Sequence, residues 1–424
     1  MKTTGYLELV RGNANFRYIW LGEIVSMLGD WFNLIASATL IARLTGSGAA
    51  VGGLFVLRMV APFLVSLLAG VAADRYNRKQ ILIWSDILRG LVVLGFFLVR
   101  EAGDVWLLYV LTTLQLGIGG LFFPARSAIL PDLVREDELG AANTLSSATW
   151  STMLAFGAAI GGIVSGSFGV YTAFGVDALT FFVSAWMIMQ IRYVQPPISQ
   201  TEQRGMRGVL ATYVEGLQYL LNRRDLLAIV LHKSFVSLLM FVPFQVLFVA
   251  LSESRYVYGV GGGIGLGIMY AMVGVGTGIS PLLGRWFTGD DERRLRLAIG
   301  VCYLIGLAGS ALTGLLGPFW FFLLGCLIRG LGTGAIWVYS TQLIYQSTSE
   351  QVRGRTFATD FALFTIAGAL GAALTGWAVD TLGGIAPVIW GMVALWLIPT
   401  FFWFWWIGFG VRKNEVIGMG DALK

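Results

Sequence analysis

Twelve long apolar segments follow one another along the chain, separated by shorter stretches that contain most of its charged residues. Each segment has the length of about 20 residues that a helix needs to cross the hydrocarbon core of a bilayer. We expect helices, because a backbone exposed to lipid has to satisfy its own hydrogen bonds. The expected spans are residues 18–42, 49–73, 80–99, 105–130, 143–167, 170–192, 227–251, 264–287, 296–316, 319–344, 356–380 and 386–409.

Composition agrees with this pattern. Apolar residues make up 56% of the 424 positions and charged residues only 12%. Soluble domains carry about 25% charged residues, and the mean hydropathy of this chain is +0.75. We therefore predict an all-α membrane protein.

The cations predict the orientation of the chain. With both termini in the cytoplasm, most of the 29 Lys and Arg residues fall in cytoplasmic loops and tails, as the positive-inside rule requires. Residues 1–17 lack an apolar core followed by a cleavage site, so we expect the first span to act as the insertion signal. These observations predict a multi-pass protein of the cell (inner) membrane. The net charge of +5 belongs to its loops, and we expect no nucleic-acid partner.

A polar stretch separates the first six spans from the last six. Within it, apolar residues recur every four positions, as on a helix that lies flat on a membrane surface; they are Val209, Tyr213, Leu217 and Leu221. We predict a six-helix bundle at 1–192, a cytoplasmic linker with this amphipathic helix at 193–226, and a second six-helix bundle at 227–424.

The two halves resemble each other in sequence. Gly140 corresponds to Gly354 about half a chain length later, and each lies between the fourth and fifth spans of its half. Gly70 has a weaker counterpart in Gly284. Repeats of this kind predict a transporter whose substrate site lies between the halves near the midplane. The alternative is a gene duplication that only packs helices.

Seven short stretches carry a family resemblance. They are Asn15-Phe16-Arg17, Trp20-Leu21-Gly22, Leu28-Gly29-Asp30-Trp31, Leu44-Thr45-Gly46-Ser47, Gly70-Val71-Ala72-Ala73-Asp74-Arg75-Tyr76-Asn77-Arg78-Lys79, Pro124-Ala125-Arg126-Ser127-Ala128-Ile129-Leu130-Pro131-Asp132-Leu133-Val134 and Arg353-Gly354-Arg355. Together they resemble the macrolide-efflux-type, drug:proton antiporter-like branch of the major facilitator superfamily, over essentially the whole chain. The resemblance implies twelve transmembrane helices in two pseudo-symmetric six-helix bundles. It also implies export of macrolides, other amphipathic drugs or siderophores, or movement of lysophospholipids.

Three positions depart from the family's patterns. Asn77 stands where the loop pattern has Gly, although Asn also tolerates a left-handed backbone. Arg329 begins a motif that resembles one usually found in the fourth span of antiporters, and the fourth span here lacks the arginine at 113–117. Ala158 replaces a proline in the fifth span. These departures weaken a direct transfer of the antiporters' proton relay to this chain.

Charged side chains within the spans are the candidate coupling residues, because each needs a partner, a water-filled cavity or a proton. Glu23 and Asp30 lie two turns apart on one face of the first span. The same polar stripe includes Ser26, Asn33 and Ser37. We predict that Asp30 or Glu23 binds the coupling proton, with Arg329 as a third candidate. The alternative for Asp30 is a permanently paired structural carboxylate.

A candidate gate lies at the cytoplasmic ends of the spans. Its residues are Gly70, Asp74, Arg75, Arg78, Arg126 and Asp132. We expect Asp74 to face a helix N-terminus that also holds Asp360, because a carboxylate is stabilised there. Arg126 is expected to pair with Asp132 or Asp74, and a snorkelling side chain is the alternative.

Substrate selectivity is expected from side chains on the cavity-type spans, which offer apolar faces with a few polar groups. The candidates are Gln115, Phe241, Gln245, Trp337, Tyr339 and Gln342. The alternative for the aromatic candidates is packing alone.

Other membrane residues are assigned to structure. Asp86 and Arg89 lie three positions apart on one helix and are expected to neutralise each other. His232 is expected at the membrane interface. The two cysteines fall within apolar spans, so we expect packing residues and no disulfide or metal site.

These patterns predict a secondary active efflux transporter that exports an amphipathic or lipophilic small molecule by alternating access, with proton antiport. The alternative is a lysophospholipid flippase or siderophore exporter of the same fold without obligatory proton exchange. We do not expect an enzyme or a cofactor, because the sequence contains neither a Gly-Lys-Ser/Thr phosphate loop nor a His-Glu-x-x-His pair. The expected partners are a small amphipathic substrate, protons and membrane lipids, and we expect a monomer.

Overall fold

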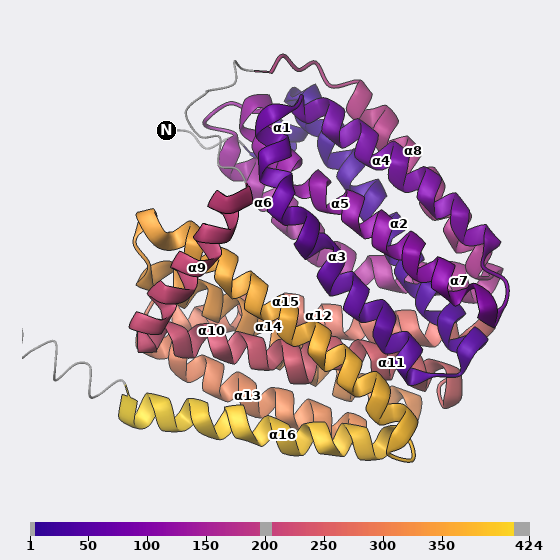
Figure 1. Cartoon of the computed structure of the whole chain (residues 1–424). Coiled ribbons are helices and arrows are strands. Elements are labelled where there is room, and N and C mark those ends of the chain that lie inside the picture. Colours follow the sequence, from indigo (N-terminus) through magenta and orange to yellow (C-terminus); the bar gives the residue numbers. More distant parts are fainter. Residues whose placement is uncertain (1–4, 196–205, 411–424) are drawn as a thin grey trace, which may run out of the picture. The chain divides into compact units, whose positions relative to one another are not determined.

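The computed structural model describes residues 5–195 and 206–410, without the side chains of residues 66–75, 147, 151, 206–212, 350, 351, 409 and 410. Within these ranges every regular element is a helix and no strand occurs (Figure 1). The predicted all-α membrane fold is therefore confirmed.

Twelve helical spans of the described chain are long and apolar enough to cross a membrane, which is the predicted number. The first six comprise α2 (Ala14–Thr45), α3 (Gly48–Arg75), α4 (Arg78–Leu94) with η1 (Gly95–Leu98), α5 (Val105–Leu133), α6 (Leu139–Thr152) with α7 (Ala158–Phe168), and α8 (Val170–Met189). The last six comprise α10 (Arg224–Val236) with α11 (Val242–Ser254), α12 (Gly263–Thr288), α13 (Glu292–Gly314), α14 (Phe319–Ser347), α15 (Glu350–Thr381) and α16 (Ile385–Trp405). The chain is a multi-pass membrane protein.

Shorter helices connect or interrupt the spans. They are α1 (Tyr6–Gly12), η2 (Ala102–Asp104), η6 (Val260–Gly262) and α9 (Met206–Asn222), the last in the segment where an amphipathic helix was predicted. Two spans contain a π-helical turn: η3 (Met153–Gly157) joins α6 to α7, and η5 (Ser237–Phe241) joins α10 to α11. A third π turn, η7 (Trp406–Gly410), follows α16. Such turns often mark functional sites, because they leave carbonyl groups outside the regular hydrogen-bond ladder.

The chain divides into two compact units. The first unit comprises residues 1–210 and 248–271, and the second comprises residues 211–247 and 272–424. The first unit includes the start of α12 because glycines bring its backbone against α7: a Cβ on Gly162 would lie 2.6 Å from Gly267 Cα. In the second unit, α13 and α16 run side by side (Figure 1). The division at 193–226 that the sequence predicts stays a prediction.

Side-chain caps fix the starts of α2 and of α4, which carries Arg78 of the candidate gate. The Asn13 side chain accepts a hydrogen bond of 3.0 Å from Phe16 N at the start of α2, and Asn77 accepts one from Gln80 N at the start of α4. The φ angle of Asn77 is −63°. Asn77 is therefore an N-cap, and the expected use of its tolerance for left-handed backbone is wrong.

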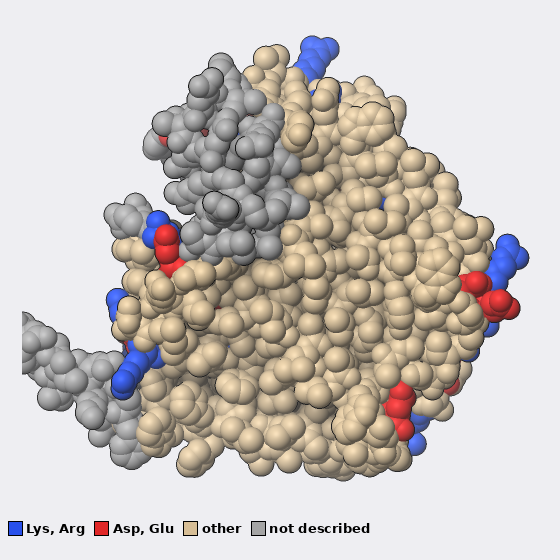
Figure 2. All heavy atoms as spheres, in the orientation of Figure 1, with Lys and Arg blue, Asp and Glu red and all other residues tan. Residues whose placement is uncertain are grey.

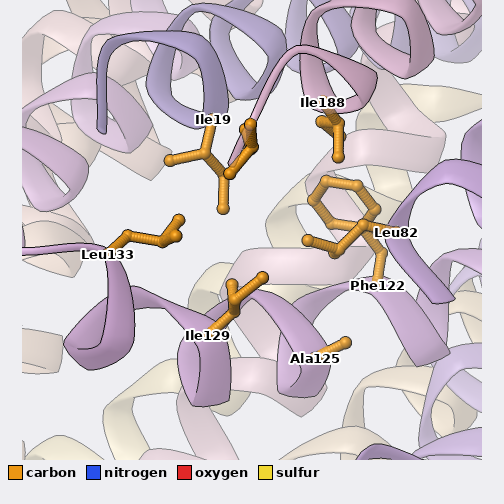
Figure 3. Close-up of a cluster of buried hydrophobic side chains, with 8 residues drawn as sticks. Ile19, Leu82, Phe122, Ala125, Ile129, Leu133 and Ile188 are labelled. Atoms are coloured by element: carbon orange, nitrogen blue, oxygen red, sulfur yellow. The ribbon is translucent and has the colours of Figure 1, made fainter. Parts of the chain in front are cut away.

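A buried apolar cluster joins four spans of the first unit. It includes Ile19 of α2, Leu82 of α4, Ile129 of α5 and Ile188 of α8, whose side chains converge in Figure 3. The cluster lies one or two turns from Arg78 and Asp132 along α4 and α5. It therefore holds the helix ends that carry the candidate gate.

The surface of the spans is largely uncharged. Figure 2 shows a broad area of uncharged residues, with Lys, Arg, Asp and Glu gathered in a few places near its margins. Large apolar side chains such as Trp84, Trp106, Trp286 and Phe401 are exposed. Exposure of this kind fits contact with lipid, where apolar side chains are stable.

Candidate functional site

The strongest candidate for a coupling site is an ion pair between α2 and α4. Arg89 Nη2 donates a hydrogen bond of 2.5 Å to Asp30 Oδ1, and the guanidinium lies 4.0 Å from the ring centroid of Phe181. The Arg89 side chain is 6% exposed and the Asp30 side chain 33%. Asp30 is therefore the more exposed member of the pair.

Two further carboxyls lie in the same part of the first unit. Asp86 Oδ1 is 3.7 Å from Arg89 Nη1, and Asp86 Oδ2 accepts a hydrogen bond of 2.5 Å from Ser184 Oγ. The predicted pairing of Asp86 with Arg89 is present, but Arg89 approaches Asp30 more closely. Asp177 of α8 is fully buried; its Oδ2 accepts a long hydrogen bond of 3.5 Å from Gln115 Nε2, and the Asn33 side chain also interacts with its carboxyl.

A second guanidinium completes this group. Arg58 of α3 interacts electrostatically with Asp30, Asp177 and Arg89, and with Tyr270 of α12. We call Asp30, Arg58, Asp86, Arg89 and Asp177 the charge cluster. It brings together side chains from α2, α3, α4 and α8 that the sequence places on four separate spans.

From the sequence, Asp86 and Arg89 are expected to have only a structural role, and Asp177 has no assigned role. Gly29 allows Asp177 to lie close to α2, because α8 packs directly against this glycine: a Cβ on Gly29 would lie 2.5 Å from Asp177 Oδ1. A glycine next to a membrane carboxylate could have indicated this close approach. The glycine alone could not have indicated which helix makes this close approach.

Glu23, which lies on α2 like Asp30, forms a separate ion pair with Arg126 of α5. Arg126 Nη2 donates a hydrogen bond of 2.8 Å to Glu23 Oε2 and also donates to Ser146 Oγ. Both charged side chains are mostly buried. The expected pairing of Arg126 with Asp132 is therefore wrong, because Arg126 is directed toward α2 and α6, and the expected pairing with Asp74 falls on a side chain outside the described residues.

The candidate gate is partly described. Arg78 donates hydrogen bonds to Asp132 Oδ2 at 2.9 Å and to Ala128 O at 3.0 Å. The Tyr193 hydroxyl also donates to Asp132 Oδ2, at 3.0 Å. Burial, followed by this contact with the Asp132 carboxylate, raises the pKa of Tyr193. Gly70, Asp74 and Arg75 fall in the last part of α3, and their side chains lie outside the described residues.

Arg329 in α14 contacts a π turn of the second unit. Its Nη1 donates a hydrogen bond of 2.9 Å to Met240 O in η5, and its guanidinium lies 4.2 Å from the ring centroid of Phe244. These contacts hold α14 against the irregular part of the seventh span. The predicted coupling role of Arg329 stays a prediction.

A buried ion pair lies in the second unit. Lys233 Nζ is 2.5 Å from Asp360 Oδ2, and it also lies 4.2 Å from the ring centroid of Trp337. Asp360 was expected at a helix N-terminus. Because α15 begins at Glu350, Asp360 lies well inside the helix, and that expectation is wrong.

His232 is buried beside this pair. Its ring nitrogens form hydrogen bonds of 2.6 Å with the Tyr303 hydroxyl and 2.5 Å with the Ser340 hydroxyl. The expected depth of His232, at the membrane interface, stays a prediction. The two hydroxyls satisfy both ring nitrogens inside the bundle.

The six substrate candidates lie in several places. Gln115 contacts Asp177 in the first unit. In the second unit, the rings of Phe241 and Trp337 both contact Phe364, at centroid distances of 5.9 Å and 4.9 Å. The remaining three do not share that position: Gln245 is half-buried on α11, Tyr339 is buried beside Gly284, and Gln342 Nε2 donates to Asp290 Oδ1 at 2.8 Å.

A metal-binding arrangement was not predicted. Among the residues that the structure describes, no group of three or more His, Cys, Asp or Glu side chains could hold a metal ion.

The fold and these membrane-embedded charges define a secondary transporter of a known class. The chain belongs to the Major Facilitator Superfamily, whose family model matches residues 19–358. The family predicted from the sequence is confirmed. Members of this superfamily are transporters, so the assignment places the chain outside the enzymes.

Two relatives in sequence show which transporters the chain resembles. It is 22% identical to "Macrolide efflux protein A" of Streptococcus pyogenes, over 87% of this chain and 90% of that protein. It is 30% identical to "Uncharacterized MFS-type transporter YfiS" of Bacillus subtilis (strain 168), over 50% of each chain. The match to YfiS therefore spans about half of that relative's length.

A solved structure shares the fold. The crystal structure of a bacterial homologue of the human lysosomal transporter Spinster gives a TM-score of 0.73 and covers 96% of this chain and 98% of its own. The two sequences are 15% identical. This likeness concerns the fold alone.

Proposed function

We propose that this protein is a secondary efflux transporter that exports an amphipathic or lipophilic small molecule by alternating access, in exchange for protons. The observation that carries the proposal is the pairing of a partly exposed carboxylate, Asp30, with a buried guanidinium, Arg89. The similarity to a macrolide efflux protein over most of both chains supports export.

Protonation of Asp30 would change the energy of the charge cluster. The ionised carboxylate holds Arg89 through a charge-assisted hydrogen bond. A neutral Asp30 loses most of this attraction, so Arg89 turns toward Asp86. Such a change biases a two-state transporter only if the two states hold the pair differently. In an alternating-access cycle, proton occupancy of Asp30 selects between them.

Glu23 and Arg126 give a second place for the same chemistry. Their ion pair ties α2 to α5, and Ser146 adds α6. A proton on Glu23 would weaken this tie. The driving force is adequate, because one charge that crosses 100 mV contributes about 2.3 kcal/mol.

The aromatic rings of the second unit suit an amphipathic substrate. Phe241 and Trp337 both contact Phe364, and Trp337 lies next to Lys233 of the Lys233–Asp360 pair. Trp337 is 42% exposed. Apolar faces with a few polar groups nearby are typical of small-molecule sites.

Orientation and location complete the proposal. The distribution of Lys and Arg supports cytoplasmic termini in a cell membrane. We further propose a monomer that contacts membrane lipids.

Transport by purified protein in liposomes tests the proposal. The vesicles contain a pH-sensitive dye, and uptake of radiolabelled erythromycin and of ethidium is followed with and without a pH gradient. We expect gradient-driven uptake, accompanied by proton movement in the opposite direction. Asp30→Asn should abolish both, while Asp137→Asn, on an exposed loop, should preserve both.

Two results would contradict the proposal. Transport that is independent of the pH gradient and moves no protons would favour the lysophospholipid flippase or siderophore exporter. Proton-coupled uptake that persists in Asp30→Asn would remove Asp30 from the coupling machinery.

A further inference from the structure

The charge cluster contains more acidic groups than basic ones. Its three carboxyls, on Asp30, Asp86 and Asp177, lie among two guanidinium groups, on Arg58 and Arg89. Arginine keeps its charge in proteins. If all three carboxyls were ionised, one negative charge would stay uncompensated in a membrane-embedded part of the protein, where charges are costly. One bound proton makes the cluster neutral.

The contacts of the three carboxyls differ. Asp30 is held by Arg89 at 2.5 Å, and Asp86 lies 3.7 Å from Arg89 and accepts a short hydrogen bond from Ser184. Asp177 forms no ion pair with any residue that the structure describes. Its Oδ1 is buried and has no hydrogen-bond partner among those residues.

From this geometry we infer that Asp177 is a second proton-binding site of the transporter, which stores the proton that Asp30 receives. The structural part of this inference, a proton on Asp177, stands independently. The transport part rests on the proposed proton antiport.

The groups around Asp177 fit both of its protonation states. Asn33 of α2 and Gln115 of α5 lie beside it, and each amide can donate or accept a hydrogen bond. Asp30 on α2, Arg58 on α3 and Arg89 on α4 are the charged groups that act on Asp177. Asp86 on α4 interacts with Asp30 and Arg89. The other elements packed on α8, namely α7 and η1, contain no titratable residue.

The two carboxyls, on Asp30 and Asp177, interact electrostatically. Asp30 is partly exposed, and Gly29, next to it on α2, lies directly against the Asp177 carboxyl. In the transfer step, the O–H bond of protonated Asp30 breaks and an O–H bond forms on the Asp177 carboxylate. Asp30 becomes an anion again and its ion pair with Arg89 forms again, while Asp177 becomes neutral. Total charge is unchanged by this step.

Infrared spectroscopy of the full-length protein in liposomes tests the proton directly. With isotope-labelled aspartate, the carbonyl stretch of a protonated aspartic acid is distinguished from all glutamic acid bands. We expect wild-type protein at neutral pH to show this band, Asp177→Asn to lack it, and Asp86→Asn to keep it. Absence of the band from wild type, or its persistence in Asp177→Asn, would overturn the inference.

Stability provides a second readout. Asparagine has nearly the shape of a neutral aspartic acid, so Asp177→Asn should unfold at a temperature equal to or above that of wild type. Asp30→Asn removes the ionised partner of Arg89 and should unfold at a lower temperature. A lower unfolding temperature for Asp177→Asn would mean that Asp177 is ionised in the wild type and would overturn the inference.

A third variant covers the case in which Asp177→Asn does not fold. Asp177→Glu keeps a carboxyl at the site but removes the labelled aspartate, so the aspartic acid band should vanish and a glutamic acid band should appear. If the aspartic acid band persists, the proton lies elsewhere.

Transport separates this inference from the proposed function. Asp177→Asn should still bind erythromycin but should lose proton-driven uptake at least tenfold. If wild-type protein transports erythromycin without moving protons, the proposed antiport fails, and the infrared band still decides whether Asp177 holds a proton. Unchanged proton-driven uptake by Asp177→Asn would overturn the storage role.

Discussion

Lys233 of α10 donates a hydrogen bond of 2.5 Å to Asp360 of α15, and both side chains are almost completely buried in the second unit. The Lys233 ammonium also lies 4.2 Å from the ring centroid of Trp337 on α14. One charge pair therefore links three spans. Each ion is tolerated there because the other neutralises it.

Removal of one partner from this pair should be more harmful than removal of both. Lys233→Met leaves an uncompensated carboxylate, and we expect a loss of about 3–5 kcal/mol in stability. Asp360→Leu leaves an uncompensated ammonium at a similar cost. The double variant has no buried charge and should recover most of the loss. Thermal unfolding of the four purified proteins measures the order, and a double variant less stable than either single one would contradict this account.

Close packing of α7 against α12 in the first unit should not tolerate a larger side chain. A Cβ on Gly162 would lie 2.6 Å from Gly267 Cα, so Gly162→Leu must push the helices apart. We expect a destabilisation of about 1–3 kcal/mol together with slower erythromycin export. Thermal unfolding and export from vesicles measure the two effects.

Gly140 provides the matched control for this substitution. Nothing lies within 4 Å of a Cβ built on Gly140, and Gly140 lies near the start of α6. Gly140→Leu should therefore leave stability within about 0.5 kcal/mol of wild type. Equal losses of stability in Gly162→Leu and Gly140→Leu would show that packing against α12 does not cause the destabilisation.

The role of Asn77 can be separated from backbone conformation by two substitutions. Asn77→Ala removes the side chain that accepts from Gln80 N and should cost about 0.5–2 kcal/mol. Asn77→Gly should cost only a few tenths of a kcal/mol, because glycine is a fair N-cap. If Asn77→Gly were stabilising and Asn77→Ala neutral, the capping interpretation would be wrong.

The fold was predictable from the sequence because lipid imposes one rule on every span. A run of about 20 apolar residues has to be helical, so the spans were found without knowledge of their neighbours. The π turns at Met153–Gly157 and Ser237–Phe241 were not predicted. Met153–Gly157 contains no proline. Pro243 follows Ser237–Phe241 and removes a backbone donor there, but a proline within a span does not by itself predict a π turn.

The partners of the membrane charges were harder to predict. The spacing of Asp86 and Arg89 on one helix indicated their contact, because a helical repeat fixes it. The contacts of Arg89 with Asp30 and of Arg126 with Glu23 depend on how different helices pack. Periodicity on a single helix does not contain this information, and the expected contact of Arg126 with Asp132 is wrong for this reason.

The Arg78–Asp132 pair allows a test that separates gating from stability. About a quarter of each side chain is exposed, and ion pairs at such positions contribute about 0–1 kcal/mol. We therefore expect Asp132→Asn to change thermal stability little. If the pair holds one state of the transport cycle, losing about 1 kcal/mol shifts the ratio of states about fivefold, and the rate of erythromycin export should change accordingly. Asp137→Asn removes a more exposed contact with Arg135 and serves as the control. Unaltered export by Asp132→Asn, measured beside that control, would remove the pair from the gate.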